Sequence, residues 1–535
     1  MSSSTTGSVG DADKTLPLRP GQPDDRENGN PLNAELKEYV DSLRDRYHVP
    51  GVSIGVINGD ETYLSGYGHA KLDPNVDATE DTLFYIGSVT KGFLAASLFH
   101  TLEFTATKSD KPTTLDTKIR DIIPDDFVTT DEFITQRATL RDALHHRLGF
   151  PRHDLSYGGP NFTVKDVVRS LRHLQPSAEL REKFQYFSMG YMTLQHVIET
   201  ITGKWCGDVY DEVVFKPLGM SSSTVELKRA QGSPHTLATG YANTATETNP
   251  QPWFDSRLIG QGGVISNARD MAKYLRAMIN RTGLPISDDS FNKLFLPGMI
   301  GGTPPPKDHS PHLYAAGWIV SSYHGHHFIQ HAGGVPGFGA MAGFLPARKW
   351  GAVVLTNGDF GGFAAAEALF YRLMDDFLDV PADDRVDQTQ KWDAIKMMKA
   401  AATPTACARV YPNVPSPPVP HCIPLEEYAG TYSHPGYGEL TFEVTKPESD
   451  VPVAATTTQI LHAAKKQSEW NVVFDLEHVN GEEFICYIDT LVRSPLVQLA
   501  VEPCKAEFEV GRDGKVSRLG IQIESGLEKI WFVRG

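Results

Sequence analysis

The sequence Phe84-Tyr85-Ile86-Gly87-Ser88-Val89-Thr90-Lys91-Gly92-Phe93 decides how this chain is interpreted. Residues 94–99 follow at once, and their Ala, Leu and Phe recur at helical spacing, which predicts a helix. Ser88 and Lys91 share a face of its first turn. The unpaired amides of that turn and a nearby amine both make an alkoxide on Ser88 less costly. The spacing therefore points to a nucleophilic serine, although an N-capped helix with a solvated lysine uses the same residue types.

Length, charge and cysteine content limit the function classes. The chain has 535 residues, which favours two folded units joined by linkers. A net charge of -16 argues against nucleic acid or an anionic membrane as partner. No secretory signal and no apolar stretch of membrane-spanning length is visible. The five cysteines are scattered and odd in number, which favours a reduced, cytoplasmic setting.

Composition and pattern divide the chain into four parts. Residues 1–30 are rich in Ser, Gly, Asp and Pro and are expected to form a disordered tail. Residues 31–381 run from a helix through strands, a helical middle and further strands to a last helix. That order favours an α+β fold in which one antiparallel sheet carries an inserted helical domain. Residues 382–424 are expected to be a helical and Pro-rich linker, and residues 425–535 a small β-barrel or sandwich.

Several elements can be predicted from local pattern. A helix is expected over 33–47, because Leu36, Val40, Leu43 and Tyr47 form one apolar stripe. A helix ending at a glycine is expected within 139–150, and a single strand over 314–321.

A second serine lies in an esterase-like pattern. Gly51-Val52-Ser53-Ile54-Gly55 matches Gly-x-Ser-x-Gly, which requires a sharp turn from a strand into a helix. Here a strand over 52–57 continues into a hairpin, so Ser53 is interpreted as structural.

Two later segments supply what a serine nucleophile lacks. Tyr186 precedes a predicted helix start, and a tyrosine near a cationic lysine can lose its proton more easily and serve as a base. A glycine-rich segment beginning at His331 follows a predicted strand. Its amides could pair with the Ser88 amide as an oxyanion hole.

With these segments in order, the chain resembles the serine hydrolases related to class C β-lactamases, D-alanyl-D-alanine carboxypeptidases, S12-type peptidases and family VIII esterases. The resemblance covers residues 31–380. Its motifs are Ser88-Val89-Thr90-Lys91, Tyr186-Phe187-Ser188 and His331-Ala332-Gly333. Supporting matches are Phe215-Lys216-Pro217-Leu218-Gly219-Met220, Gly262-Gly263-Val264-Ile265-Ser266 with Asp270, and Leu355-Thr356-Asn357.

The resemblance implies a role for each motif residue. Ser88 is expected to be acylated, Lys91 to deprotonate or stabilise it, and Tyr186 to shuttle a proton to the leaving group. His331 is expected to contact both substrate and Tyr186. The amides of Ser88 and Gly334 would hold the oxyanion, with Gly333 and Ser188 beside the substrate.

Two departures from the family pattern bear on substrate. Ser188 stands where relatives have Asn, and His331 stands where many have Lys, so β-lactam hydrolysis is disfavoured. The resemblance then implies hydrolysis of a small ester or amide, including a D-amino-acid peptide, through acyl-Ser88. An acyltransferase working in a small-molecule pathway is the alternative. A catalytically silent binding protein is a third reading.

Cofactors and partners follow from the same reasoning. No cofactor or metal is expected. His324, His326, His327 and His331 straddle a glycine turn without a carboxylate or Cys at ligand spacing, so a solvated hairpin is favoured over a metal site. His145 and His146 are interpreted as scaffold.

Residues 425–438 resemble the lipocalin-like barrel that is appended to some relatives. In those relatives the barrel can shape the cleft or form an oligomer contact, and the alternative is a packing module without contact to substrate. A homo-oligomer is left open.

Overall fold

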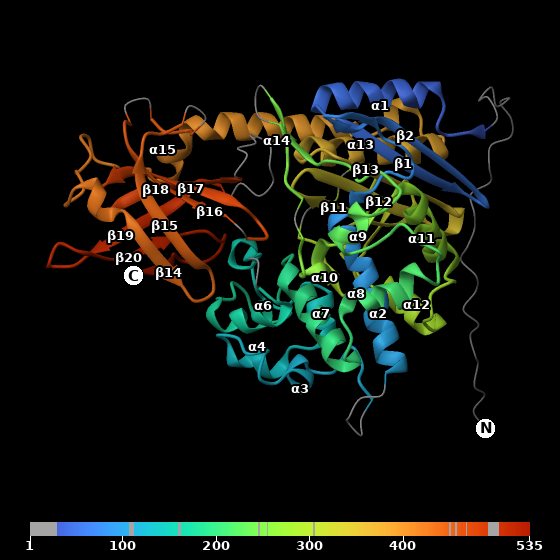
Figure 1. Ribbon diagram of the computed structural model, residues 1–535, viewed down its shortest axis with the longest axis horizontal. Coiled ribbons are helices and arrows are strands. Elements are labelled where there is room, and N and C mark those ends of the chain that lie inside the picture. Colours follow the sequence, from blue (N-terminus) through green and yellow to red (C-terminus); the bar gives the residue numbers. More distant parts are fainter. Residues whose placement is uncertain are drawn as a thin grey trace, which may run out of the picture.

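The computed structural model describes residues 29–105, 112–158, 162–243, 247–253, 255–302, 305, 307–448, 451–454, 457–466, 468–490 and 502–535. The tail expected over residues 1–30 lies outside this part of the chain, apart from its last two residues. A larger unit, coloured blue to yellow in Figure 1, lies beside a smaller barrel coloured orange to red. The α+β fold class with a C-terminal barrel is thus confirmed.

A nine-stranded antiparallel sheet forms the centre of the larger unit. Its order is β3-β2-β1-β13-β12-β11-β10-β9-β8, so the first strands pair with the last ones. Val52 and Gly339, for example, both lie opposite Thr356 on the strand between them. The strands are β1 (Gly51–Asn58), β2 (Glu61–Leu72), β3 (Asn75–Asp77), β8 (Met299–Ile300), β9 (Leu313–Tyr314), β10 (Ile319–Tyr323), β11 (His326–Val335), β12 (Phe338–Leu345) and β13 (Trp350–Thr356).

Helices cover both faces of this sheet and enclose two separate buried cores. α1 (Ala34–Tyr47) and α13 (Phe360–Phe377) cover one face, and the predicted stripe of α1 is buried there. α2 (Thr90–Phe104) and α11 (Ala268–Asn280) lie on the other face. The inserted middle contains α3 (Ile119–Ile122), α4 (Glu132–Arg137), α5 (Leu140–Leu144), α6 (Val164–Ser170), α7 (Ser188–Thr202), α8 (Cys206–Tyr210), α9 (Leu227–Gln231), α10 (Ile259–Gly262) and α12 (Asp288–Leu294).

The C-terminal strands close into an antiparallel barrel rather than a sandwich. Tyr428, Tyr432, Phe442, Phe484 and Phe508 fill its interior, with ring centroids 5.0–6.2 Å apart. The barrel interior is therefore a packed core. Its strands are β14 (Gly430–His434), β15 (Gly438–Thr445), β16 (Ile460–Lys465), β17 (Val472–Asn480), β18 (Glu483–Thr490), β19 (Cys504–Val510), β20 (Val516–Ile521) and β21 (Ile530–Arg534).

The segment expected to be a linker is anchored at both ends. α14 (Gln388–Ala402) spans the top of the molecule between the two units in Figure 1. Its Trp392 packs against Phe360 and Phe363 of α13, with centroids 5.0 and 5.4 Å away. Beyond α15 (Ala406–Val410), the Tyr411 hydroxyl donates to a carbonyl of β18 at 2.8 Å. The helical part of this segment thus follows the surfaces of both units.

Two predicted elements differ from the structure. The helix expected within 139–150 ends at Leu144, because the chain turns at His146, which has a φ of 54°. The strand expected over 314–321 is broken into β9 and β10 at Gly317, where φ is 73°. A Cβ on Gly317 would lie 2.6 Å from the Lys91 backbone, so the break brings the sheet edge against α2.

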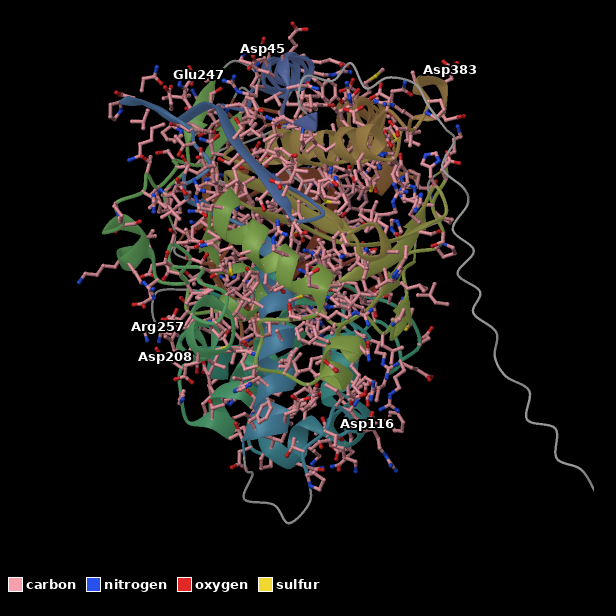
Figure 2. The ribbon with its side chains drawn as sticks, turned by 90° about the vertical axis from the view of Figure 1, so that its right-hand side faces the viewer. Asp45, Asp116, Asp208, Glu247, Arg257 and Asp383 are labelled. Carbon is pink, nitrogen blue, oxygen red and sulfur yellow. The ribbon has the colours of Figure 1, made fainter. Side chains whose placement is uncertain are left out.

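The surface carries the negative charge expected from composition. Asp45, Asp116, Asp208 and Asp383 all lie at the outline of the molecule in Figure 2. None of the helices in the described part of the chain combines the length and apolarity that a lipid-spanning helix needs.

Candidate active site

Ser88 lies at the entrance of α2, as its sequence predicts. It is the middle residue of a 3-10 turn, η2 (Gly87–Val89), which runs directly into the helix. Gly87 has a φ of 52°, and a Cβ there would lie 2.6 Å from the amide nitrogen of Gly334. Glycine is required before Ser88 both for this backbone angle and for this close approach.

Lys91 points its amine at the Ser88 hydroxyl. Its Nζ lies 3.0 Å from Ser88 Oγ and 2.8 Å from the backbone carbonyl oxygen of Gln261, a residue of α10. The lysine has no exposed surface. The rings of Tyr186 and Tyr191 lie 4.8 and 5.4 Å from the amine. The amine is therefore enclosed by protein, with the Ser88 hydroxyl within proton-transfer distance.

These surroundings hold the pKa of Lys91 well below its usual value. Desolvation is the largest cause, because a buried ammonium loses its hydration. The nearby Arg152 guanidinium lowers the pKa further, and Asp154 opposes that effect. A neutral amine can accept the Ser88 proton, which an ammonium cannot do.

Tyr186 contacts Ser88 as well, but its pKa shifts in the direction opposite to the prediction. Burial raises the pKa of Tyr186, while a hydrogen bond with Ser88 and the charge of Arg152 lower it to a smaller extent. The expectation that this tyrosine ionises more easily is therefore wrong. Lys91 is the group whose pKa is depressed, and the Tyr186 phenol keeps its proton for donation.

The third motif lies inside a strand rather than after one. His331, Gly333 and Gly334 all belong to β11, which packs against η2. A Cβ on Gly333 would lie 2.0 Å from the Ile86 carbonyl oxygen and 3.1 Å from the Ser88 amide nitrogen. Only glycine permits this contact, which brings the amides of Ser88 and Gly334 to the same edge of the site.

A chain of hydrogen bonds occupies both nitrogens of His331. The Phe187 amide donates to His146 Nδ1 at 3.0 Å, so the proton of this neutral imidazole sits on Nε2 and is donated to the Tyr314 hydroxyl at 3.1 Å. Tyr314 in turn donates to His331 Nε2 at 3.1 Å. His331 Nδ1 donates to the Ala332 carbonyl oxygen at 2.6 Å. Both imidazoles are thereby fixed as neutral donors and acceptors.

Burial enforces the same protonation state. Desolvation lowers the pKa of His331 to about 3, and the charge of Lys91 acts in the same direction. The ring centroid of His331 lies 6.4 Å from that of Tyr186. The predicted direct contact of His331 with substrate and Tyr186 would therefore require the link to Tyr314 to break.

Ser188 is buried as the first residue of α7, two positions after Tyr186. Arg152, Gln261 and Tyr314 also belong to this cluster, although no motif in the sequence predicts them. The Arg152 guanidinium lies 5.2 Å from the Tyr186 ring centre and pairs with Asp154 at 2.6 Å, yet 53% of its side chain is exposed. These residues belong to no local pattern, so the sequence offers no signal for them.

Two alternative sites can be compared with this one. Ser53 is buried in β1, and its hydroxyl donates to the Thr79 carbonyl at 2.6 Å, as expected of a structural serine. Among the residues that the structure describes, no group of three or more His, Cys, Asp or Glu side chains could hold a metal ion.

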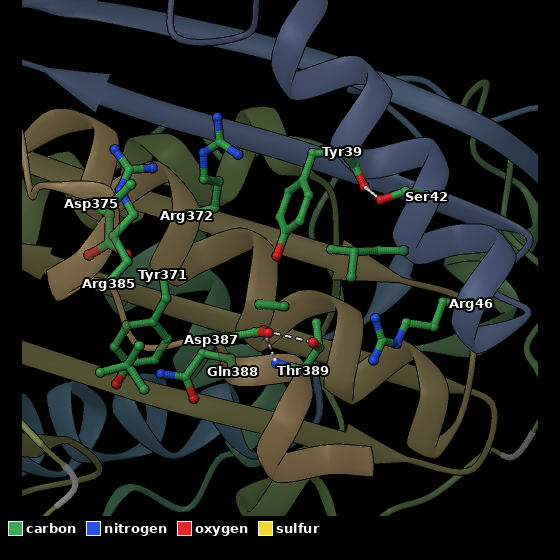
Figure 3. A pocket seen from close by; sticks show the side chains of 14 residues that line it. Tyr39, Ser42, Arg46, Tyr371, Arg372, Asp375, Arg385, Asp387, Gln388 and Thr389 are labelled. Atoms are coloured by element: carbon green, nitrogen blue, oxygen red, sulfur yellow. Dashed lines mark hydrogen bonds between the residues drawn. The ribbon is translucent and has the colours of Figure 1, made fainter.

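A pocket of about 580 Å³ lies between α1, α13 and the residues that precede α14 (Figure 3). It is on the sheet face opposite Ser88, in contact with the other buried core. Its arginines already pair with carboxylates: Arg385 with Asp376 at 2.7 Å, and Arg46 with Asp393. It is therefore separate from the cluster around Ser88.

Comparisons with known proteins agree with this geometry. A family model described as Beta-lactamase matches residues 36–374, and one described as a domain of unknown function (DUF3471) matches residues 415–534. An unguisins hydrolase of Aspergillus campestris is 34% identical over 515 residues, covering 95% of this chain and 92% of that protein. An unguisins hydrolase of Aspergillus violaceofuscus is 32% identical over 94% of this chain and 90% of its own.

Solved structures share the fold at low identity. The octameric penicillin-binding protein homologue from Pyrococcus abyssi has a TM-score of 0.57 and 19% identity, covering 93% of this chain and 99% of its own. A D-amino acid amidase from Ochrobactrum anthropi, complexed with L-phenylalanine amide, has a TM-score of 0.53 and 22% identity, covering 65% of this chain and 99% of its own.

Proposed function

This chain belongs to the beta-lactamase family and is a serine hydrolase of amide or ester bonds. We propose that Ser88 is the residue that receives the acyl group of the substrate. The observation that carries the proposal is the Lys91 amine, 3.0 Å from Ser88 Oγ in surroundings that favour its neutral form. A serine hydroxyl is a weak nucleophile until a base takes its proton. The pair supplies nucleophile and base in contact.

In the acylation step, Ser88 Oγ attacks the substrate carbonyl carbon while its proton passes to Lys91 Nζ. The carbonyl oxygen becomes an oxyanion and accepts hydrogen bonds from the amides of Ser88 and Gly334. When the intermediate collapses, the bond to the leaving amine or alkoxide breaks. Tyr186 gives its proton to that leaving group and takes one from the Lys91 ammonium, which returns to the neutral amine.

In the deacylation step, water attacks the ester carbonyl of acyl-Ser88 and gives a proton to the Lys91 and Tyr186 pair. Collapse of the second tetrahedral intermediate releases a carboxylic acid and returns the proton to Ser88 Oγ. The raised pKa of Tyr186 suits this relay, because a phenol that stays protonated is available as an acid in each turnover.

His331 and Ser188 have supporting roles in this proposal. His331 fixes the orientation of β11 through hydrogen bonds with the Tyr314 hydroxyl and the Ala332 carbonyl oxygen. These hydrogen bonds hold Gly333 and Gly334 against η2. Ser188 lies beside Tyr186 at the start of α7, where a smaller side chain than Asn leaves more room for the acyl group. A neutral His331 offers no cation for the carboxylate of a β-lactam, which supports hydrolysis of other amides and esters.

The substrate class is an amide, with unguisins the first compounds to test. Two relatives that match over nine-tenths of this chain are named unguisins hydrolases. A neighbour of similar fold is titled a D-amino acid amidase, so D-configured amino acid amides form the second group. The Lys91 and Tyr186 relay suits amides, since an amine must be protonated as it leaves.

We further propose the larger organisation of the protein. The catalytic unit comprises residues 31–381, the connecting segment 382–424 and the barrel 425–535. All five cysteines are free thiols in the structure, which supports a cytoplasmic location. A homo-oligomer is proposed from the fold neighbour that is titled octameric.

The proposal is tested by intact-mass detection of a covalent adduct. Wild-type protein should gain one acyl mass with an activated ester, and Ser88→Ala should gain none. A panel of unguisins, D-amino acid amides and a cephalosporin then ranks substrates by kcat/KM. Adding an alcohol or amine acceptor separates hydrolysis from acyl transfer, since a transferase would give the acceptor's ester or amide. Labelling that persists in Ser88→Ala, or absence of any adduct in the wild type, would overturn the proposal.

A further inference from the structure

The barrel reaches into the catalytic unit through the turn between β16 and β17. Glu469 lies on this turn, and its backbone nitrogen is 2.0 Å from the place where a Cβ on Gly158 would stand. Gly158 has a φ of 111°, which only glycine adopts readily. Next to it, Trp470 Nε1 donates to the Tyr157 hydroxyl at 3.3 Å, and Lys465 Nζ donates to the Leu155 carbonyl oxygen at 2.5 Å.

The Glu469 carboxyl group approaches the nucleophile through Gln261. Gln261 Nε2 donates to Glu469 Oε1 at 3.3 Å, while the carbonyl oxygen of the same glutamine accepts from Lys91 Nζ at 2.8 Å. The following residue, Gly262, would place a Cβ 3.5 Å from the carbonyl carbon of Gly87, which directly precedes Ser88. Only one glutamine thus separates a barrel side chain from the reacting groups.

Glu469 retains hydrogen-bonding capacity beyond its protein contacts. Ser256 Oγ donates to Oε2 at 2.9 Å and Gln261 to Oε1, whereas a carboxylate offers about four acceptor positions. The side chain is partly exposed, although protein surrounds it. Burial raises the pKa of Glu469 to about 7, and the two hydrogen bonds only partly offset this. No lysine or arginine in the described residues forms a salt bridge with it at 4.0 Å or less.

Aromatic side chains occur close to the turn that carries Glu469: Trp470 is the next residue, and its Nε1 reaches the Tyr157 hydroxyl. Burial raises the pKa of Tyr85, and the charges of Asp255 and Glu469 add to this effect. The Tyr85 ring packs against Trp253 at 5.0 Å and Phe338 at 5.8 Å. One acceptor next to an apolar wall is typical of a subsite that fixes the orientation of an otherwise apolar ligand.

We propose that Glu469, carried by the barrel, is a specificity-determining residue that accepts a hydrogen bond from an N–H group in the acyl part of the substrate. This inference rests on the proposed function of Ser88. The acyl side is assigned because Tyr186 protonates the leaving group, whereas Glu469 is connected to a different contact of Lys91, the backbone carbonyl of Gln261. A peptide substrate presents such an N–H one bond from the α-carbon, while a simple fatty acyl ester presents none.

The test compares two activated esters that differ only at this nitrogen. The probes are the p-nitrophenyl esters of N-acetyl-phenylalanine and of its N-methylated analogue, each in D and L form. The assays are run at about pH 8.5, above the Glu469 pKa of about 7, so that the carboxyl group is ionised. A hydrogen bond to a charged acceptor changes kcat/KM by about tenfold or more. Wild-type protein should therefore prefer the N–H ester of one configuration by at least about tenfold. Glu469→Ala should bring that ratio close to one, and Glu469→Gln, which keeps one acceptor oxygen, should give an intermediate ratio.

A matched control and the Ser88 variant make each outcome decisive. The control variant is Glu443→Gln, at an exposed position on β15 of the same barrel. Its ratio of kcat/KM between the N–H ester and the N-methylated ester should equal that of the wild type. A ratio unchanged in Glu469→Ala, or kcat/KM values that fall equally for both esters, would overturn the inference while leaving Ser88 as the nucleophile. Cleavage that persists in Ser88→Ala would instead overturn the proposed function. The two failures are thus distinguishable in one set of assays.

Discussion

The hydroxyl of Tyr314 lies 3.1 Å from His331 Nε2 and 3.1 Å from His146 Nε2. Because His146 Nδ1 accepts a hydrogen bond from the amide of Phe187, this hydroxyl joins the third motif to the segment that carries Tyr186. All three side chains are buried. Breaking this link leaves two imidazole nitrogens without a partner in the interior, which is costly. The strand that presents Gly333 and Gly334 also loses a fixed contact.

Tyr314→Phe should therefore lower both stability and activity. We expect the free energy of unfolding to fall by about 1–3 kcal/mol and kcat/KM to fall by about tenfold or more, because the Gly334 amide is less well placed. Denaturant unfolding and steady-state kinetics measure the two effects. Tyr323→Phe is the matched control, since its hydroxyl donates to Asp375 at 2.6 Å on the opposite face of the sheet. Equal loss of activity in both variants would contradict the positional role of Tyr314.

Lys91→Met should abolish acylation while making the fold more stable at neutral pH. We expect kcat to fall by at least about 10³-fold, because the variant loses the amine that is proposed to take the Ser88 proton. The free energy of unfolding should rise by about 1 kcal/mol or more, as an apolar side chain replaces a buried ionisable one.

The pH dependence of that stability gain follows from the sign of the shift. The pKa of Lys91 is lower in the folded state than in the unfolded chain, so between those two pKa values the unfolded state binds more protons. Wild-type stability should rise with pH across this window, up to about pH 10.4. Lys91→Met should lack that rise, and the exposed Lys37→Met should keep it. A variant with an unchanged pH slope would show that the buried amine is not shifted.

Arg152→Gln should move the acid limb of the kcat/KM profile to higher pH. The guanidinium lowers the pKa of Lys91, so its removal raises that pKa and keeps the amine protonated over a wider range. Because the Arg152 side chain is 53% exposed, solvent screening keeps the displacement modest, and high salt should reduce it in the wild type. Arg512→Gln, exposed on the barrel, serves as the control. A limb that moves to lower pH would contradict the assignment of Lys91 as the base.

Ser53→Ala should leave the enzyme active. The Ser53 hydroxyl has one buried partner, the Thr79 carbonyl oxygen, so its loss should cost about 1 kcal/mol of stability. Adduct formation and kcat should stay close to the wild-type values. Loss of the adduct in Ser53→Ala with retention in Ser88→Ala would reverse the roles of the two serines.

Local spacing was enough to predict the contact between Ser88 and Lys91 and the fold class. Ser88 and Lys91 are three residues apart at a helix start, so secondary structure alone sets them side by side. The apolar stripe of α1 and the glycines around Ser88 and His331 likewise report requirements that act over a few residues. These signals located the candidate site and predicted an α+β unit followed by a β domain.

Only the tertiary structure decided the protonation states and which distant residues join the candidate site. The pKa values of Lys91, Tyr186 and His331 depend on burial by segments that are distant in sequence, and the hydrogen bonds from His146 through Tyr314 join three such segments. Glu469 lies 381 residues after Ser88 and reaches the site only because the barrel packs against residues 152–158. Desolvation and long-range packing leave no periodic trace in a sequence, since they arise only when distant segments exclude water from one another.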